Sequence, residues 1–206
     1  EYARTFERTS LSADRLILAG KCGASDAYSG IAANPLVGRV VNRHCSSGGT
    51  ALLTEVPEMF GAEHLLMKRA ASNAVFNDIV KLINDFKAYY REHDQPIYEN
   101  PAPGNKAGGI STLEEKSLGC VQKGGQAPIV QVADYGESVA PSQSGLCLVN
   151  APGNDLVSST ALAAAGAHLV MFTTGRGTPL GVPTPTMKIS SNSDLASRKK
   201  GWIDFD

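Results

Sequence analysis

The stretch TEVPEMFGAEH, residues 54–64, gathers three carboxylates and one imidazole within a short distance along the chain. Such side chains can act as general acids or bases, or can hold a metal ion. The stretch directly follows the apolar run Ala51–Leu53, so Glu55 lies where a buried strand is expected to end. An isolated charge is costly there unless it is paired or bound to a cation. We therefore interpret Glu55 as a metal ligand or a base.

The other polar side chains of this stretch have competing interpretations. Glu58 lies in the expected first turn of a helix, where the helix dipole already favours a carboxylate, so its role stays open. Glu63 is most simply a surface residue. His64 is either a structural histidine on a helix or, because it is close to the carboxylates, a ligand or a base.

A second group of reactive side chains, Cys22 and Asp26, follows the apolar run Leu16–Ala19. A thiolate, a carboxylate and an imidazole together would suit a borderline-soft ion such as Fe²⁺ better than Mg²⁺, although this spacing does not define a metal motif. The chain has four cysteines and no C-x-x-C pair, which argues against a zinc ribbon or a thioredoxin-type site. Reduced thiols and a cytoplasmic location are expected, with the cysteines other than Cys22 read as small buried hydrophobic residues.

Two cations lie on glycine-containing loops. Lys106 follows Gly104 and could bind a substrate carboxylate or act as a base, against the alternative of an ordinary solvated lysine. Arg176 has the planar fork that suits a carboxylate. The sequence around these residues lacks a P-loop and a complete dinucleotide fingerprint, and neither G-x-S-x-G nor H-E-x-x-H occurs. Nucleotide binding, serine hydrolase and zincin activities are therefore disfavoured.

Short apolar runs alternate with helical patterns along the chain. Runs that are apolar throughout are typical of strands buried on both faces of a parallel sheet. We predict strands at Leu16–Ala19, Ala51–Leu53, Pro128–Val132, Leu146–Val149, Leu169–Phe172 and Met187–Ile189. We predict helices at Pro35–His44, Pro57–Ala70, Asn73–Glu92, Ser111–Lys123 and Asp155–Ala165. This order predicts a mostly parallel α/β sheet with helices on both faces, whose post-strand loops meet at one edge.

The 19 residues from His93 to Ser111 interrupt this alternation with a long irregular segment. Long loops inside compact domains are usually functional or disordered. Aromatic and aliphatic residues among its Pro, Gly, Asn and Lys favour an ordered binding loop.

Composition sets the broad class of the protein. With 206 residues, of which 42% are hydrophobic and 19% charged, we expect a single α/β domain over residues 1–206. The formal net charge of −1 offers no basic surface for nucleic acid or an anionic membrane, and no apolar run approaches the roughly 20 residues of a membrane span. No signal peptide is recognised. Because the chain begins with Glu1 instead of Met, we expect it to be part of a longer chain.

Several motifs together resemble the altronate/galactarate dehydratase family. The stretches that carry the resemblance are KCGASD (21–26) with ANP (33–35), TEVPE (54–58), NPAPGNK (100–106) and FTTGRGTP (172–179). They run in order over nearly the whole chain. Ala24 replaces the second glycine of the commoner CGGSD form. Residues 55–64 and 150–155 are more similar to the altronate branch than to the galactarate branch.

This resemblance implies a fold and an activity. Members carry a small β-rich N-terminal domain, a middle segment and a large Rossmann-like C-terminal α/β domain, of which this chain would be the greater part. They dehydrate sugar acids to 2-keto-3-deoxy acids with Fe²⁺ or a similar divalent ion such as Mn²⁺. D-Altronate would give 2-keto-3-deoxy-D-gluconate, by removal of the C2 proton and loss of the C3 hydroxyl. A homo-oligomer is expected for the full-length protein.

Under this resemblance we assign roles to individual side chains. The expected metal ligands are Cys22, Glu55 and His64. The expected catalytic groups are Lys106, His64 and Glu55. The expected substrate-binding residues are Ser25, Asp26, Asn34, Asn105, Thr174 and Arg176. Two alternatives stay open: a dehydratase for galactarate or another aldarate, and a Rossmann-like binding or assembly module without catalysis of its own.

Overall fold

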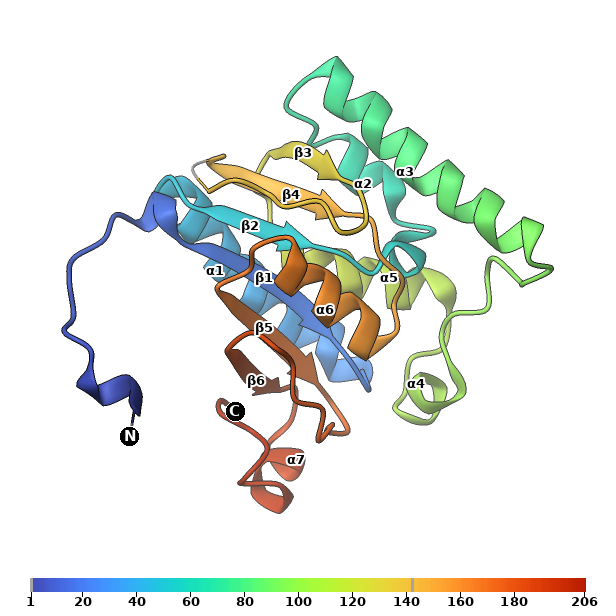
Figure 1. Ribbon diagram of the computed structural model, residues 1–206. Helices are drawn as coiled ribbons and strands as arrows, with labels where there is room; N and C mark the ends of the chain where they lie inside the picture. The colour runs from blue at the N-terminus through green and yellow to red at the C-terminus, as the bar shows by residue number, and fades with distance from the viewer. Residues whose placement is uncertain (1, 142) are drawn as a thin grey trace.

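The computed structural model describes residues 2–141 and 143–206, and a six-stranded sheet lies at its centre (Figure 1). The strands are β1 (Ile17–Cys22), β2 (Thr50–Leu53), β3 (Ile129–Ala133), β4 (Gly145–Val149), β5 (Leu169–Thr174) and β6 (Thr186–Ser190). Their spatial order is β3-β4-β2-β1-β5-β6, and every neighbouring pair is parallel. This confirms the predicted Rossmann-like parallel α/β sheet.

Helices cover both faces of the sheet, as predicted. The α-helices are α1 (Asn34–Ser46), α2 (Glu63–Met67), α3 (Asn73–Glu92), α4 (Pro103–Ala107), α5 (Leu113–Val121), α6 (Asp155–Ala164) and α7 (Ser193–Arg198). Side chains alternate across a strand. In β1, Leu18 therefore packs in the same cluster as Val37 of α1, while Ala19 belongs to the opposite cluster with Leu162 of α6.

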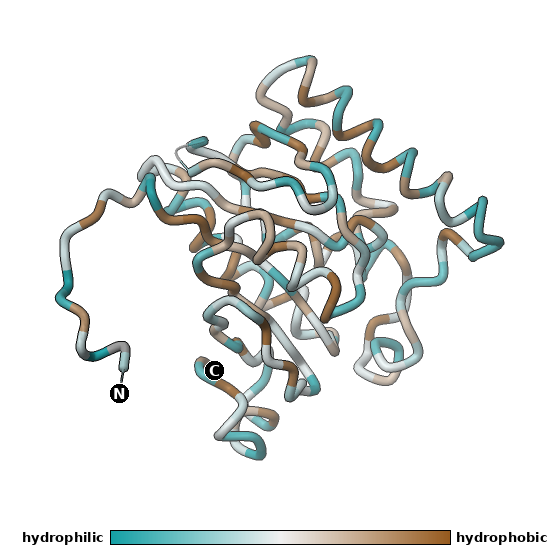
Figure 2. The backbone as a smooth tube through the Cα atoms, viewed as in Figure 1, coloured by the Kyte–Doolittle hydropathy of each residue, from teal (hydrophilic) through white to brown (hydrophobic). Residues whose placement is uncertain are grey.

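Helix α3 shows how an amphipathic pattern fixes a long element. Ser72 caps its start, because the Ser72 side chain accepts a hydrogen bond from the backbone N–H of Val75. The predicted apolar face is buried at Ile79 and Ile83, and apolar and polar residues alternate along the helix in Figure 2. The prediction for Asn73–Glu92 is confirmed at both ends.

The predicted helix Pro57–Ala70 is wrong as a single element. The chain instead forms a 3₁₀ helix at Val56–Met59, breaks at Gly61, and resumes as α2. Gly61 has a φ of +94°, a left-handed conformation that glycine adopts without strain and that a helix interior excludes. Glu58 therefore lies in the 3₁₀ helix that follows β2 and not in an α-helix.

Two of the predicted helices are capped by the residue just before them. The helix predicted from Ser111 begins at Leu113, and the Thr112 side chain caps it by accepting a hydrogen bond from the backbone N–H of Glu115. Asp155 is the first residue of α6, as predicted, and Asn154 takes the cap position. The Asp155 carboxylate is therefore available for Lys21, with which it forms an ion pair.

The loops that follow the strands meet at the carboxyl edge of the sheet. The backbone N–H of Gly23, after β1, donates to the carbonyl of Thr173 in β5, and that of Val56, after β2, donates to the carbonyl of Ala151. The segment between α3 and α5 joins this edge, because the Asn105 amide of α4 donates to the carbonyl of Ser25. Among the described residues, no helix combines the length and apolarity needed to cross a membrane.

Candidate metal and active site

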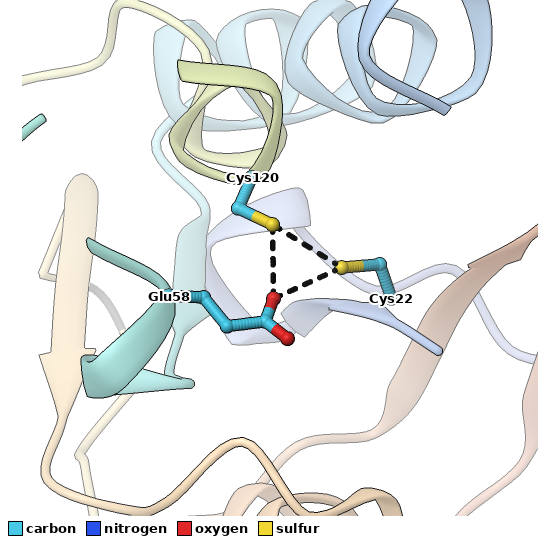
Figure 3. A group of neighbouring side chains, drawn as sticks. All are labelled: Cys22, Glu58 and Cys120. Carbon is cyan, nitrogen blue, oxygen red and sulfur yellow. Dashed lines mark hydrogen bonds between the residues drawn. The ribbon is translucent and has the colours of Figure 1, made fainter. Parts of the chain in front are cut away.

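Three possible metal ligands meet at the carboxyl edge of the sheet (Figure 3). Cys22 ends β1, Glu58 lies in the 3₁₀ helix after β2, and Cys120 lies in the last turn of α5. The two Sγ atoms are 3.6 Å apart, and Glu58 Oε2 lies 3.3 Å from Cys22 Sγ and 2.9 Å from Cys120 Sγ. All three donor atoms lie within 4.8 Å of one another. We call this group the ligand triangle.

Glu55 lies beside the triangle, and its carboxylate is occupied by lysines. Lys21 Nζ lies 2.5 Å from Oε1 and Lys123 Nζ lies 2.6 Å from Oε2. All three side chains are at most 1% exposed. Glu55 has a φ of +71°, a left-handed conformation that a non-glycine residue rarely adopts, and here it turns the chain from β2 into the 3₁₀ helix. The geometry therefore favours Glu55 as a buried counter-ion.

Lys116 and Lys123 bring positive charge to the sulfur atoms of the triangle. Lys123 Nζ lies 2.9 Å from Cys22 Sγ, whereas Lys116 Nζ lies 3.9 Å from that sulfur and 3.3 Å from Glu58 Oε2. Hydrogen bonding from the Cys120 thiol and the nearby lysines lower the pKa of Cys22 well below its usual range. The lowered pKa favours the thiolate of Cys22, which is the form that binds a metal.

The lysines of this region keep their protons. Burial alone would lower the pKa of Lys21, Lys116 and Lys123, but the surrounding anions raise it above the ordinary lysine value in each case. The pKa of Glu55 is raised to about 7, mainly by burial. Negative charge on Cys22 also raises it, whereas the ammonium groups of Lys123 and Lys21 lower it. The lysines therefore act as fixed positive charges.

The charges of the site fit a divalent cation. We call the following residues the charged cluster: Lys21, Cys22, Glu55, Glu58, Lys116, Cys120, Lys123 and Asp155. The hydrogen bond with Cys22 and burial raise the pKa of Cys120 well above its usual range, so this thiol would lose its proton on binding a metal. With both thiols ionised in that way, five members of the cluster are negative and three positive, so one divalent cation would bring the cluster to neutrality. Two thiolates and one carboxylate are a donor set for Fe²⁺ or Zn²⁺ in preference to Mg²⁺.

Two of the predicted catalytic side chains lie apart from the triangle. His64 is exposed on α2, and Lys106 is exposed on α4. Neither contributes a donor atom to the triangle. Their roles as ligand or base therefore stay predictions. The structure does bring together Cys22 and Glu55, whose Sγ and Oε1 atoms are 3.9 Å apart.

Most of the predicted substrate-binding residues hold loops together at this edge. The Asp26 carboxylate accepts hydrogen bonds from Ser29, Ser191 and Asn192. Asn34 donates to the carbonyl of Gly119 and accepts from the Thr173 hydroxyl. These bonds fix the frame of the site.

The remaining members of that set differ in their contacts. The Ser25 hydroxyl accepts from Lys116, 3.4 Å away, and the Thr174 hydroxyl accepts from the backbone N–H of Gly177. Arg176 is exposed and lies against Gly104, where an added Cβ would overlap its Nη1 atom. Arg176 is thus brought beside the segment that contains Asn105 and Lys106.

The sequence prediction overlooked Lys116, Cys120 and Lys123. A signal for them was present, because these residues are spaced four and three apart and so share one face of the predicted helix 111–123. Lys21 and Asp155 were also overlooked. Nothing local marks them, since the ion pair between them joins residues 134 positions apart.

Two cavities open beside the triangle. The α5 cavity, about 430 Å³, is lined by residues of 25–34 and of 110–122, among them Lys116 and Cys120. The loop cavity, about 540 Å³, is lined by Glu58, Tyr90, residues of 95–105 and residues 152–154. The triangle therefore has one member facing each cavity, Cys120 on one side and Glu58 on the other.

Comparisons with known proteins agree with these features. Altronate dehydratase of Bacillus subtilis (strain 168) is 56% identical over 206 residues, covering 100% of this chain and 41% of the relative. Altronate dehydratase of Escherichia coli (strain K12) is 59% identical over 186 residues, covering 90% of this chain and 37% of the relative. Galactarate dehydratase (L-threo-forming) of Escherichia coli (strain K12) is 36% identical over 200 residues, covering 97% of this chain and 37% of the relative.

This chain thus spans less than half the length of these relatives. The family described as D-galactarate/Altronate dehydratase, C-terminal, matches residues 13–206. The resemblance carried by the sequence motifs is confirmed, and the chain belongs to the D-galactarate/altronate dehydratase family, as a match to its C-terminal region.

Proposed function

We propose that this chain belongs to a metal-dependent hydro-lyase that removes water from D-altronate to give 2-keto-3-deoxy-D-gluconate. The observation that carries the proposal is the ligand triangle of Cys22, Glu58 and Cys120 at the carboxyl edge of the sheet, in a chain of this family. Relatives named altronate dehydratase are 56% and 59% identical, against 36% for the one named galactarate dehydratase. This difference supports altronate over the alternative aldarate substrates.

The metal we propose is Fe²⁺, with Mn²⁺ as the alternative. Cys22, Glu58 and Cys120 would hold it, and the charge balance of the cluster supports a divalent ion. A divalent cation, when bound, supplies the positive charge that stabilises an enediolate formed next to a carboxylate. The buried ammonium groups of Lys116 and Lys123 add fixed positive charge beside the same position.

The proton at C2 requires a base, for which Lys106 and His64 are the candidates. Lys106 is the better placed of the two, because its helix α4 is held against the loop after β1, where the Asn105 amide donates to the carbonyl of Ser25. Arg176 lies beside the same loop, since its backbone N–H donates to the carbonyl of Ala24, and its guanidinium could pair with a substrate carboxylate. Glu55 would contribute indirectly, by holding Lys21 and Lys123.

The biological setting is part of this proposal. All four cysteines are free, and the Cys22 and Cys120 sulfurs lie close together without a bond, which supports a reducing compartment such as the cytoplasm. We propose that residues 1–206 form one catalytic domain of a longer, homo-oligomeric protein. Its binding partner would be the sugar-acid substrate, and we propose no binding to nucleic acid or to a membrane.

The test uses the full-length protein, kept anaerobic and loaded with Fe²⁺ or Mn²⁺. We expect 2-keto-3-deoxy acid to form from D-altronate faster than from galactarate, and chelation to abolish its formation. Lys106→Met should lower kcat by about 10²-fold or more, because a general base contributes on that order. Lys200→Met, which changes an exposed lysine near the C-terminus of the chain, is the matched control.

Three results would contradict the proposal in different ways. A metal-loaded protein that turns over galactarate and not altronate would change the substrate. Normal turnover by Lys106→Met would remove Lys106 as the base. A protein that binds metal and altronate without turnover would favour the non-catalytic binding module.

A further inference from the structure

The loop cavity and the ligand triangle share one side chain. Glu58 Oε2 belongs to the triangle, and Glu58 also lines the loop cavity. Gly153, another lining residue, comes close to Glu58, since a Cβ there would lie 3.6 Å from Glu58 Oε1. A molecule with one end at the triangle could therefore extend past Gly153 into the loop cavity.

The position of the loop cavity fits a substrate site in this fold. Its walls include Pro57 and Glu58 after β2 and residues 152–154 after β4, two adjacent strands of the sheet. Open parallel sheets bind their ligands outside the carboxyl ends of the strands. The volume of about 540 Å³ falls within the range of roughly 300–1,000 Å³ that is usual for small-molecule sites.

The lining of the loop cavity matches a polyhydroxy chain. It carries the amides of Gln95, Asn100 and Asn154 and the phenol of Tyr90. Each amide offers both donors and an acceptor, the combination that pairs with hydroxyl groups. Asn154 sits at the cap position of α6, but its side chain makes no capping hydrogen bond there, so its amide is free of that helix.

The α5 cavity suits this ligand less well. Its rim carries two exposed carboxylates, Glu114 and Glu115, which would repel a sugar acid, and the exposed apolar side chains of Ile31 and Leu118. Apart from Glu58, the loop cavity has one such carboxylate, that of Glu99. The Asp26 carboxylate in this cavity is already occupied by loop hydrogen bonds.

We infer that the loop cavity binds the distal hydroxyl-bearing carbons of the sugar acid, with Asn100 and Asn154 as residues that determine substrate length. This inference rests on the proposed function, because it takes the carboxylate end and the reacting carbons of the substrate to lie at the triangle. The cavity then distinguishes a six-carbon acid from a short 2,3-dihydroxy acid. The short acid fills only the end beside Glu58.

The experiment measures two ligands in the full-length, metal-loaded protein. The KM for D-altronate reports the whole chain of the substrate, whereas the inhibition constant of L-glycerate, which has the C2 configuration of D-altronate, reports only the carboxylate and the first two hydroxyls. Asn100→Ala and Asn154→Ala should each raise the KM for altronate by about tenfold, the effect of losing a hydrogen bond to a ligand. The inhibition constant for glycerate, kcat and the metal content should stay within twofold.

Glu114→Ala, at the rim of the α5 cavity, is the control and should leave the KM unchanged. Three outcomes would overturn the inference. The inhibition constant for glycerate could rise in parallel with the KM for altronate, both asparagine variants could keep the wild-type KM, or the KM could rise in the control alone. Those outcomes leave the proposed function standing. A wild-type protein that does not dehydrate any sugar acid would overturn the proposed function, and this inference with it.

Discussion

The ammonium of Lys123 lies 2.9 Å from the sulfur of Cys22 and 2.6 Å from a carboxylate oxygen of Glu55. One buried cation thus joins a predicted ligand to a predicted base. Because Lys21 holds the other oxygen of Glu55, the carboxylate has a counter-ion on each side. The charged cluster is therefore organised by its lysines as much as by its possible metal ligands.

Replacement of Glu55 by glutamine should destabilise the protein strongly. The Glu55→Gln variant keeps the size of the side chain but leaves the ammonium groups of Lys21 and Lys123 without their shared partner. Breaking a buried ion pair from one side costs about 3–5 kcal/mol. Urea unfolding measures the loss. The control Asp85→Asn removes an exposed pair with Lys81 and should leave stability unchanged, and equal effects of the two variants would contradict this account.

Gly23 should be intolerant of a side chain. A Cβ at this position would lie 2.5 Å from an oxygen of Asp155, so alanine must push that carboxylate away from Lys21. We expect Gly23→Ala to lower the free energy of unfolding by about 1–3 kcal/mol, as for overpacking in a filled interior. Gly181→Ala is the control, because nothing lies within 4 Å of its added Cβ. Thermal unfolding of the two variants should separate them clearly.

The pair formed by Glu63 and Lys87 predicts a dependence of stability on pH. Partial burial alone would raise the pKa of Glu63, but hydrogen bonds from Lys87 and from the backbone N–H of Gly61 outweigh it and hold the pKa below its ordinary value of 4.5. Because the pKa of Glu63 is lower in the folded than in the unfolded protein, the pair stabilises the fold fully at pH values above the unfolded pKa. The contribution disappears as the pH falls through the folded pKa.

The variant Glu63→Gln isolates this effect. At pH 7 it should be less stable than wild type by about 0.5–1 kcal/mol, the scale of a partly exposed pair. The difference should shrink towards zero in acid. Denaturant unfolding at a series of pH values tests it, and a difference that stays constant with pH would show that another contact is responsible.

Much of the fold could be predicted because its signals are local. The apolar runs that end at Leu53 and Val149 report burial on both faces of the sheet, and the spacing along 73–92 reports an amphipathic helix. The prediction of one helix over 57–70 fails because the chain breaks at Gly61. The positive φ of Gly61 belongs to a turn that the periodicity of the sequence does not report.

The site was predicted less completely, for a physical reason. Cys22 and Glu55 can be recognised because each comes shortly after an apolar run, a pattern visible from neighbouring residues. Cys120 and Lys123 reach the same point from the face of a helix about 100 residues away in sequence, and only the packing of α5 against the sheet edge brings them there. His64 and Lys106 are close to such motifs in sequence, yet their side chains are exposed outside the triangle.

The assignment of the metal site predicts which cysteines matter. Cys22→Ser and Cys120→Ser should each lower the metal content of the purified full-length protein, because serine is a poorer ligand for a borderline-soft ion. Cys147→Ser is the matched control, since this thiol is buried elsewhere in the sheet and burial raises its pKa to about 12. Metal analysis after dialysis measures the difference, and an equal loss in all three variants would indicate general damage to the fold.

X-ray absorption spectroscopy of the full-length protein loaded with Zn²⁺ tests the central claim most directly. The ligand triangle predicts sulfur neighbours at about 2.3 Å from the metal. Their number should fall by one in Cys22→Ser or in Cys120→Ser. A first shell of only oxygen and nitrogen atoms in the wild-type protein would contradict the assignment of Cys22, Glu58 and Cys120 as the metal site.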